Sequence, residues 1–211
     1  MRTRSLSIEQ IQRTIDVFNH DRTVPMVIIG SAALKLHMRE RTDITSTKPD
    51  VDVLSSAEGI QALIIARGRG TTNPTSSLHT DAVSGHTHLT LVPHGGFVQD
   101  GALPMNAYTG FGDGQYDTSF DEVYPYAHND IQTGLRKMTL ADIIDWKLSL
   151  TNTTTNDTRQ IRDVLDVATI DGDLTPEQIE QFDERLLEKS THVRFERRIY
   201  DIDDGDLRYL L

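Results

Sequence analysis

Two short stretches, MVIIGS at residues 26–31 and DVDVL at residues 50–54, are the strongest indication of the fold of this sequence. The apolar residues in each stretch predict a buried strand. The small residues Gly30-Ser31 end the first strand and favour a tight turn into a helix. Asp50 and Asp52 stand one residue apart, so on a strand both side chains point to the same face. The sequence therefore predicts a pair of carboxylates near a strand-to-helix turn.

This acidic pair predicts a bound cation. Two carboxylates side by side disfavour each other's ionised form unless a cation lies between them. A hard divalent ion takes oxygen ligands and bridges to phosphate oxygens, so a nucleotide–magnesium complex is the expected ligand. Gly30 and the hydroxyl of Ser31 would let a phosphate chain approach the backbone at the turn. The alternative is a solvated pair of acids at a strand end, with Ser31 as an ordinary helix N-cap.

Composition excludes several classes of function. The 211 residues include no cysteine, which removes disulfides, thiolate zinc sites and thiol nucleophiles and fits a cytoplasmic protein. No uninterrupted apolar run is long enough to cross a bilayer, so we expect no membrane partner. The formal net charge of −11 argues against a surface built for nonspecific nucleic-acid binding.

The periodicity of the chain predicts an α+β fold (α/β-like) in two parts. Residues 1–137 predict a core domain of alternating helices and strands, a mixed sheet flanked by helices. Within it, Ser7 and Gln10 match a capping box at the start of the first helix, and residues 97–116 show too little periodicity to be assigned. Residues 138–211 predict a helical C-terminal region, with helices expected at 140–150, 157–170, 175–189 and 193–200.

A second group of charged residues lies in the helical region. Lys147 is on the first of these helices, and Arg159, Arg162, Asp163 and Asp166 share one face of the next. If the two helices form an antiparallel hairpin, Lys147 and this face can line a common cleft. Cations opposite two metal-binding aspartates suit phosphoryl-type chemistry on a nucleotide, because they neutralise the rest of the triphosphate.

These motifs resemble a known family. The stretch IGSAAL at 29–34 and the DVD at 50–52 are similar to the minimal nucleotidyltransferase fold. The stretches LADIIDWK at 140–147 and RDVLD at 162–166 resemble its AbiEii/MenT-type branch. That branch includes toxins of toxin–antitoxin systems, and characterised members transfer nucleotides onto RNA acceptors, tRNA ends in particular.

The resemblance implies a metal-dependent nucleotidyltransferase that moves a nucleoside monophosphate from an NTP to an acceptor hydroxyl. Its partners would be the NTP, an RNA or tRNA acceptor and an antitoxin protein, and its cofactor Mg²⁺ or Mn²⁺. The implied catalytic residues are Asp50, Asp52, Lys147 and Asp163, the implied nucleotide-binding residues are Gly30, Ser31, Lys147 and Arg162, and the implied metal ligands are Asp50 and Asp52.

The resemblance also implies a third carboxylate on a neighbouring strand. On the strand expected at residues 86–92, Thr90 or His88 takes that place, and Asp81 and Asp100 are the acidic substitutes nearby. A chain without the third carboxylate could instead be a catalytically impaired module of the same fold that binds nucleotide or protein.

The histidines provide a remote alternative. His79, His86, His88 and His94 cluster in sequence, as in a metal enzyme built on a β-barrel. No glutamate follows at a suitable distance, and the helical C-terminal half fits such a fold poorly.

Overall fold

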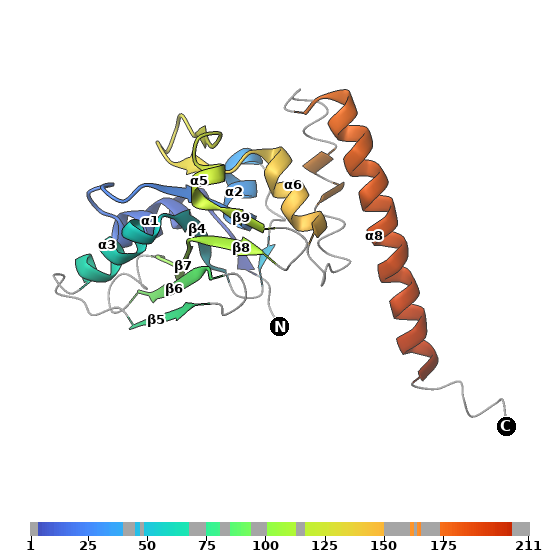
Figure 1. Ribbon diagram of the computed structural model, residues 1–211, viewed down its shortest axis with the longest axis horizontal. Helices are drawn as coiled ribbons and strands as arrows, with labels where there is room; N and C mark the ends of the chain where they lie inside the picture. Colours follow the sequence, from blue (N-terminus) through green and yellow to red (C-terminus); the bar gives the residue numbers. More distant parts are fainter. Residues whose placement is uncertain are drawn as a thin grey trace. The chain divides into compact units, whose positions relative to one another are not determined.

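The computed structural model describes residues 4–39, 45–46, 49–67, 75–80, 85–93, 101–112, 117–149, 161–162, 164–165 and 174–203, with backbone only at 4–5, 45–46, 66–67, 75–76, 112, 117, 149 and 190–203 (Figure 1). The chain divides into two compact units, Met1–Thr139 and Leu140–Leu211. In the part of the chain that is described, no helix is long and apolar enough to span a membrane.

The N-terminal unit is built on a mixed sheet of seven strands, in the order β10-β11-β2-β4-β7-β6-β5. The pairs β11–β2 and β4–β7 are parallel and the other pairs are antiparallel. The strands are β2 (Met26–Ile28), β4 (Val51–Ser55), β5 (Thr75–Thr80), β6 (Thr87–Val92), β7 (Met105–Tyr108), β10 (His128–Asn129) and β11 (Arg136–Lys137). Two small sheets pair β1 (Arg4–Ser5) with β3 (Thr45–Ser46) and β8 (Gly110–Gly112) with β9 (Asp117–Ser119).

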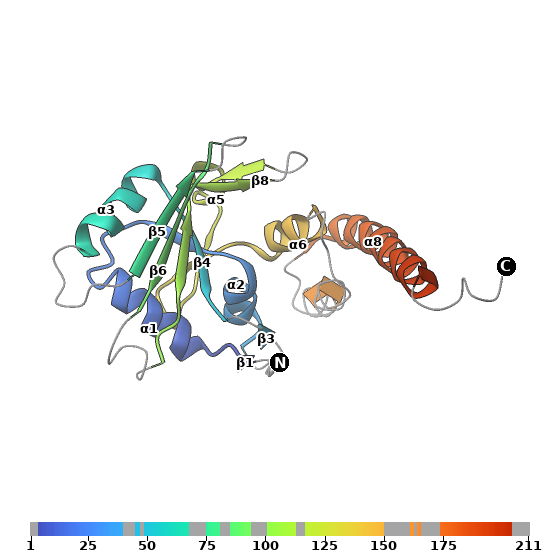
Figure 2. The same cartoon turned by 90° about the horizontal axis from the view of Figure 1, so that it is seen from below.

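Two helices of this unit begin where the sequence places their caps. Helix α1 (Ile8–Phe18) starts with the predicted capping box of Ser7 and Gln10, and at α3 (Ala57–Arg67) the Ser56 hydroxyl accepts from the Gly59 amide. Figure 2 shows α1 and α3 on one side of the sheet. The predicted α+β class, with a mixed sheet flanked by helices, is therefore confirmed.

The two faces of the central strands differ in chemistry because side chains alternate along a strand. One face is apolar and buried, and it is formed by Val51, Val53, Leu89, Leu91, Met105 and Ala107. The other face carries the polar residues Asp52, Thr90 and Asn106, which are only partly buried. This polar face is the one that can meet a ligand.

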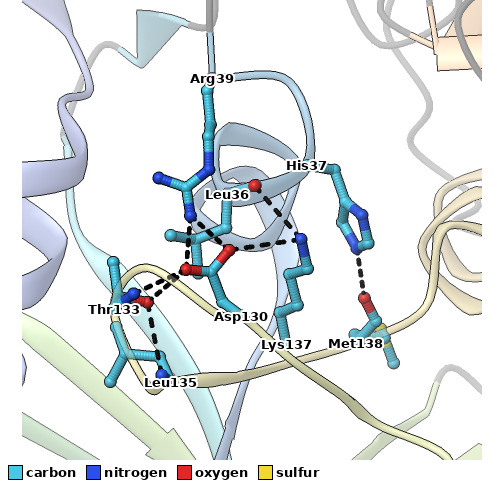
Figure 3. Close-up of polar contacts among 8 residues, drawn as sticks. All are labelled: Leu36, His37, Arg39, Asp130, Thr133, Leu135, Lys137 and Met138. Atoms are coloured by element: carbon cyan, nitrogen blue, oxygen red, sulfur yellow. Dashed lines mark hydrogen bonds and ion pairs between the residues drawn. The ribbon is translucent and has the colours of Figure 1, made fainter.

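Helix α2 (Gly30–His37) is anchored at its C-terminal end by a buried carboxylate (Figure 3). Asp130, before the turn that joins β10 to β11, pairs with Arg39 just after α2 and with Lys137 of β11 at 3.5 Å. It also accepts hydrogen bonds from the Thr133 amide at 2.9 Å and hydroxyl at 2.7 Å. Lys137 in turn donates to the carbonyl of Leu36 at 3.2 Å. These bonds fix α2 relative to the sheet edge.

The C-terminal unit pairs α6 (Leu140–Ser149) with α8 (Pro176–Asp203). Arg185 of α8 forms an ion pair with Asp145 of α6. The prediction of separate helices at 175–189 and 193–200 is wrong, because α8 runs through both ranges. No glycine or proline follows Pro176 in this stretch, so nothing in the backbone ends the helix there. Of the helix expected at 157–170, the described residues 161–162 and 164–165 are helical.

Candidate nucleotide and metal site

Strand pairing brings the acidic pair next to the start of α2. Strands β2 and β4 run antiparallel with Ile28 opposite Val53, and the amide of Ile29 donates to the carbonyl of Asp52 at 3.0 Å. Gly30 follows Ile29 directly, so the turn and Asp52 of β4 are adjacent, as the sequence predicted.

The turn itself depends on glycine. Gly30 has a φ of +61°, in the left-handed region that other residues rarely adopt. Ile29 is the N-cap of α2, and no side chain caps this helix end. The interpretation of Ser31 as N-cap is therefore wrong, because the N-cap lies two residues earlier, at Ile29. The first amides of α2, around Gly30 and Ser31, are backbone donors of the kind that receives phosphate oxygens.

An asparagine, rather than a carboxylate, lies beside the acidic pair. Strand β7 runs parallel to β4 with Asn106 opposite Asp52. The Asn106 Nδ2 donates to Asp50 Oδ2 at 3.0 Å and to Asp52 Oδ1 at 3.1 Å. A single amide group thus bridges both carboxylates.

The expectation that Thr90 or His88 takes the place of a third carboxylate beside the acidic pair is wrong, because Asn106 lies there. Strand β6 lies one strand further from β4, because β7 is inserted between them. The alternation in Met105-Asn106-Ala107-Tyr108, buried at the first and third residues, is the signal that could have revealed β7. Asp81 and Asp100 lie outside the described residues.

Thr90 and His88 extend the polar face from Asn106 across β6. The Thr90 hydroxyl donates to Asn106 Oδ1 at 3.0 Å. His88 Nε2 lies 3.1 Å from the Thr90 Oγ1 and 3.4 Å from Asn106 Oδ1. The His88 ring stacks on Tyr108, with centroids 4.4 Å apart. The acidic pair therefore continues into a hydrogen-bonded row across three strands.

The electrostatics of the site favour a cation. Burial raises the pKa of Asp50, although the hydrogen bond from Asn106 opposes this. Burial, and then the negative charges of Asp52 and Asp50, raise the pKa of Tyr108. Carboxylate and amide oxygens are ligands that Mg²⁺ accepts, with phosphate oxygens and water completing its shell. The donor set present here therefore fits a magnesium ion shared with a nucleotide.

The histidine hypothesis finds no support in the residues described. No group of three or more histidine, aspartate or glutamate side chains among them could hold a metal ion. Among the described strands the seven-stranded sheet is open, with β10 and β5 as its edges, so the remote alternative of a β-barrel is wrong. His79 faces His88 across the β5–β6 pair, while His94 lies outside the described residues.

The predicted cationic residues belong to the C-terminal unit. Lys147 lies on α6 with its side chain buried, and Arg162 is exposed. Asp163, like Arg159 and Asp166, lies outside the described residues. The roles of Lys147, Arg162 and Asp163 toward a nucleotide thus remain predictions.

We expect Asp50→Asn to raise the free energy of unfolding at pH 7 by less than about 1 kcal/mol. The raised pKa means that the folded state disfavours the ionised carboxylate. The ionised Asp50 therefore lowers the stability of the wild-type chain above that pKa, and this effect fades as pH falls. Solvent screening at this half-buried position keeps the gain small. Urea unfolding at pH 7 and at about pH 3, below the ordinary carboxyl pKa, should show the gain only at the higher pH. An asparagine variant that is less stable at pH 7 would contradict this reasoning.

Comparisons with known proteins give structural neighbours only. No protein-family model matches the chain, and comparison with curated protein sequences finds no match. The chain is similar to the solution structure of the antibiotic-resistance factor ANT(2'')-Ia, at 13% identity over 93% of this chain and 100% of that chain, with a TM-score of 0.49. It is also similar to the crystal structure of ANT(2'')-Ia in complex with adenylyl-2''-tobramycin, at 14% identity over 87% and 96% of the two chains, with a TM-score of 0.45. A third neighbour is the Megavirus polyadenylate synthase, at 13% identity over 90% of this chain but 37% of that chain, with a TM-score of 0.41. These neighbours are nucleotidyltransferases, and at such identities the likeness concerns the course of the chain and not its chemistry.

Proposed function

We propose that this protein transfers a nucleoside monophosphate from an NTP to an acceptor hydroxyl with the help of Mg²⁺ or Mn²⁺. The observation that carries the proposal is the carboxylate pair of Asp50 and Asp52, bridged by one amide and hydrogen-bonded through the backbone to the start of α2. A negative pair beside uncapped helix amides suits a metal-bound triphosphate.

The chemistry follows from this placement. Asp50 and Asp52 would hold the cation, which when bound neutralises charge on the transferring phosphate. The amides around Gly30 and Ser31 would bind the triphosphate and keep its α-phosphorus in line with the acceptor. The acceptor oxygen forms a bond to that phosphorus, the bond to the β-phosphate oxygen breaks and pyrophosphate leaves. The hydroxyl proton passes to a carboxylate of the acidic pair.

The sequence resemblance supports more specific roles for the C-terminal unit, the acceptor and the partner protein. In the stretches 140–147 and 162–166, Lys147 and Arg162 would contact the nucleotide and Asp163 would complete the catalytic set. The acceptor would be RNA, tRNA in particular, and the protein would act as the toxin of a toxin–antitoxin pair with an antitoxin protein as partner.

One observation favours a second candidate function. Asn106 occupies the place beside the acidic pair where the family would have a carboxylate, and its amide already bridges both acids. A site stabilised in this way could bind nucleotide or a partner protein without catalysis.

Incubation with each labelled NTP, Mg²⁺ and total cellular RNA distinguishes the two candidates. We expect label in RNA and release of pyrophosphate. Thermal stabilisation by NTP and Mg²⁺, without label in RNA, protein or small molecules, would support the binding module instead. Absence of both nucleotide binding and pyrophosphate release would rule out the proposed enzyme.

Gly30→Ala should weaken NTP binding by about tenfold or more, since its Cβ forces a shift of the first α2 amides. Gly134→Ala is the matched control, because Gly134 also has a positive φ, +68°, but lies in the β10–β11 turn. Both variants should lose about 1 kcal/mol of stability from backbone strain. Only Gly30→Ala should lose affinity in a fluorescent-nucleotide titration, and equal losses of affinity would contradict the phosphate-binding role.

A further inference from the structure

The hydrogen bonds around Asn106 have a fixed direction. Ionised carboxylates only accept, so Asn106 must turn its Nδ2 toward Asp50 and Asp52. Its Oδ1 then faces Thr90, whose hydroxyl hydrogen is donated to it at 3.0 Å. The Thr90 oxygen is left to accept from His88 Nε2 at 3.1 Å. The direction of every bond in the row therefore follows from the charge of the acidic pair.

This arrangement cannot persist when a cation lies between the acids. The NH₂ group of an amide has two hydrogens and offers no lone pair to a metal ion. The same side chain carries an amide oxygen, which is a ligand for hard cations. A half-turn about the Cβ–Cγ bond exchanges Oδ1 and Nδ2 without moving the backbone, and this torsion is broad and nearly two-fold.

The neighbouring side chains can also form hydrogen bonds with the Asn106 amide after it has turned. After the half-turn, Nδ2 faces Thr90 Oγ1 and His88 Nε2, the two atoms that now lie near Oδ1. The Thr90 oxygen can accept from Nδ2 while its hydrogen is donated to His88 Nε2. His88 then carries its proton on Nδ1, a change of tautomer without change of charge. Asn106, Thr90 and His88 therefore remain hydrogen-bonded to one another in both arrangements.

We propose that Asn106 turns its side-chain amide to supply a third, neutral oxygen ligand to the cation held by Asp50 and Asp52, while the Thr90 oxygen accepts from the displaced NH₂ group and the Thr90 hydrogen is donated to His88. This inference rests on the proposed function of the same site. Without a cation the NH₂ group of Asn106 bridges the two acids, and with a cation the amide oxygen of the same side chain is a ligand. Asn106 thus takes the place of a carboxylate without adding a third negative charge.

Calorimetric titration with MgCl₂ alone tests the ligand role. Asn106→Ala should weaken Mg²⁺ binding by about tenfold or more, and Asn106→Asp should strengthen it by a similar factor. Asn129→Ala is the matched control, because Asn129 is an exposed residue of β10 in the same sheet and should leave the affinity unchanged. Asp52→Ala should abolish the binding.

Nuclear magnetic resonance at constant pH tests the turn itself. The Asn106 side-chain NH₂ signals, identified by their loss in Asn106→Asp, should shift on addition of MgCl₂ in the wild-type chain and not in Asp52→Ala. The ¹⁵N signal of His88 Nε2 should change from the protonated to the unprotonated range. Unmoved NH₂ signals under saturating Mg²⁺ would overturn the inference.

The outcomes separate this inference from the proposed function. Mg²⁺ binding that depends on Asp52 but is equal in the wild type and Asn106→Ala would overturn the inference alone. Mg²⁺ binding that depends on Asn106, without transfer of nucleotide to any acceptor, would overturn the enzyme alone. Absence of Mg²⁺ binding, with or without a non-hydrolysable NTP, would overturn both.

Discussion

Asp52→Ala should reduce nucleotide transfer by about a thousandfold or more and leave the fold intact. The carboxylate is one of the two that would hold the metal, and its loss leaves the charge of the transferring phosphate uncompensated. The fold should survive because Asp52 lies on the partly exposed face of β4 and its backbone bond to Ile29 needs no side chain. The measurement is the initial rate of label transfer from an NTP, together with a thermal unfolding curve.

Asp121→Ala is a suitable control for this substitution. Asp121 is an exposed carboxylate in the first turn of α5 (Phe120–Val123) and is absent from the site. Its loss removes the same charge from the protein and should leave the rate unchanged. A normal rate in Asp52→Ala, or equal losses in both variants, would show that the acidic pair does not hold the catalytic metal.

Asp130→Ala should lower the free energy of unfolding by about 3 kcal/mol at neutral pH. Its side chain is 4% exposed, and it compensates Arg39 and Lys137, whose side chains are 22% and 13% exposed (Figure 3). Removing the carboxylate leaves two largely desolvated cations and two Thr133 donors without their acceptor. Urea unfolding followed by circular dichroism measures the loss.

Asp16→Ala is the matched control for this prediction, because it also removes a carboxylate paired with an arginine. The pair between Asp16 and Arg22 spans 2.6 Å, but the side chains are 38% and 35% exposed. Solvent screening limits such a pair to less than about 1 kcal/mol. Similar losses in both variants would contradict the role of the buried cluster as the anchor of α2.

The stability that Asp130 contributes should also depend on pH. Burial opposes its ionisation, but hydrogen bonds from Arg39 and Thr133 outweigh this and lower its pKa. A lowered carboxyl pKa contributes stability above the unfolded pKa, and this is lost as pH falls through the folded pKa. The difference between wild type and Asp130→Asn should therefore be largest near neutral pH and shrink in acid. A stability difference between the two proteins that does not change with pH would contradict the lowered pKa of Asp130 as its cause.

Local signals in the sequence were sufficient for much of the fold. The capping box at Ser7, the apolar run before Gly30 and the alternation around Asp52 act over a few residues, so they predicted α1, β2 and β4. Helix α8 was predicted at its start by Thr175, which exchanges side-chain hydrogen bonds with Gln178. Its end was missed because only the absence of a helix-breaking residue indicates that a helix continues.

By itself, the sequence determined that two carboxylates share one face of a strand and that glycine starts the helix nearby, since both follow from short-range backbone geometry. Only the tertiary structure decided what lies beside them. Asn106 meets Asp52 across 54 positions of the chain, because β7 pairs in parallel with β4 and separates it from β6. Strand order and register depend on how distant apolar faces pack together, and no local pattern in the sequence encodes them.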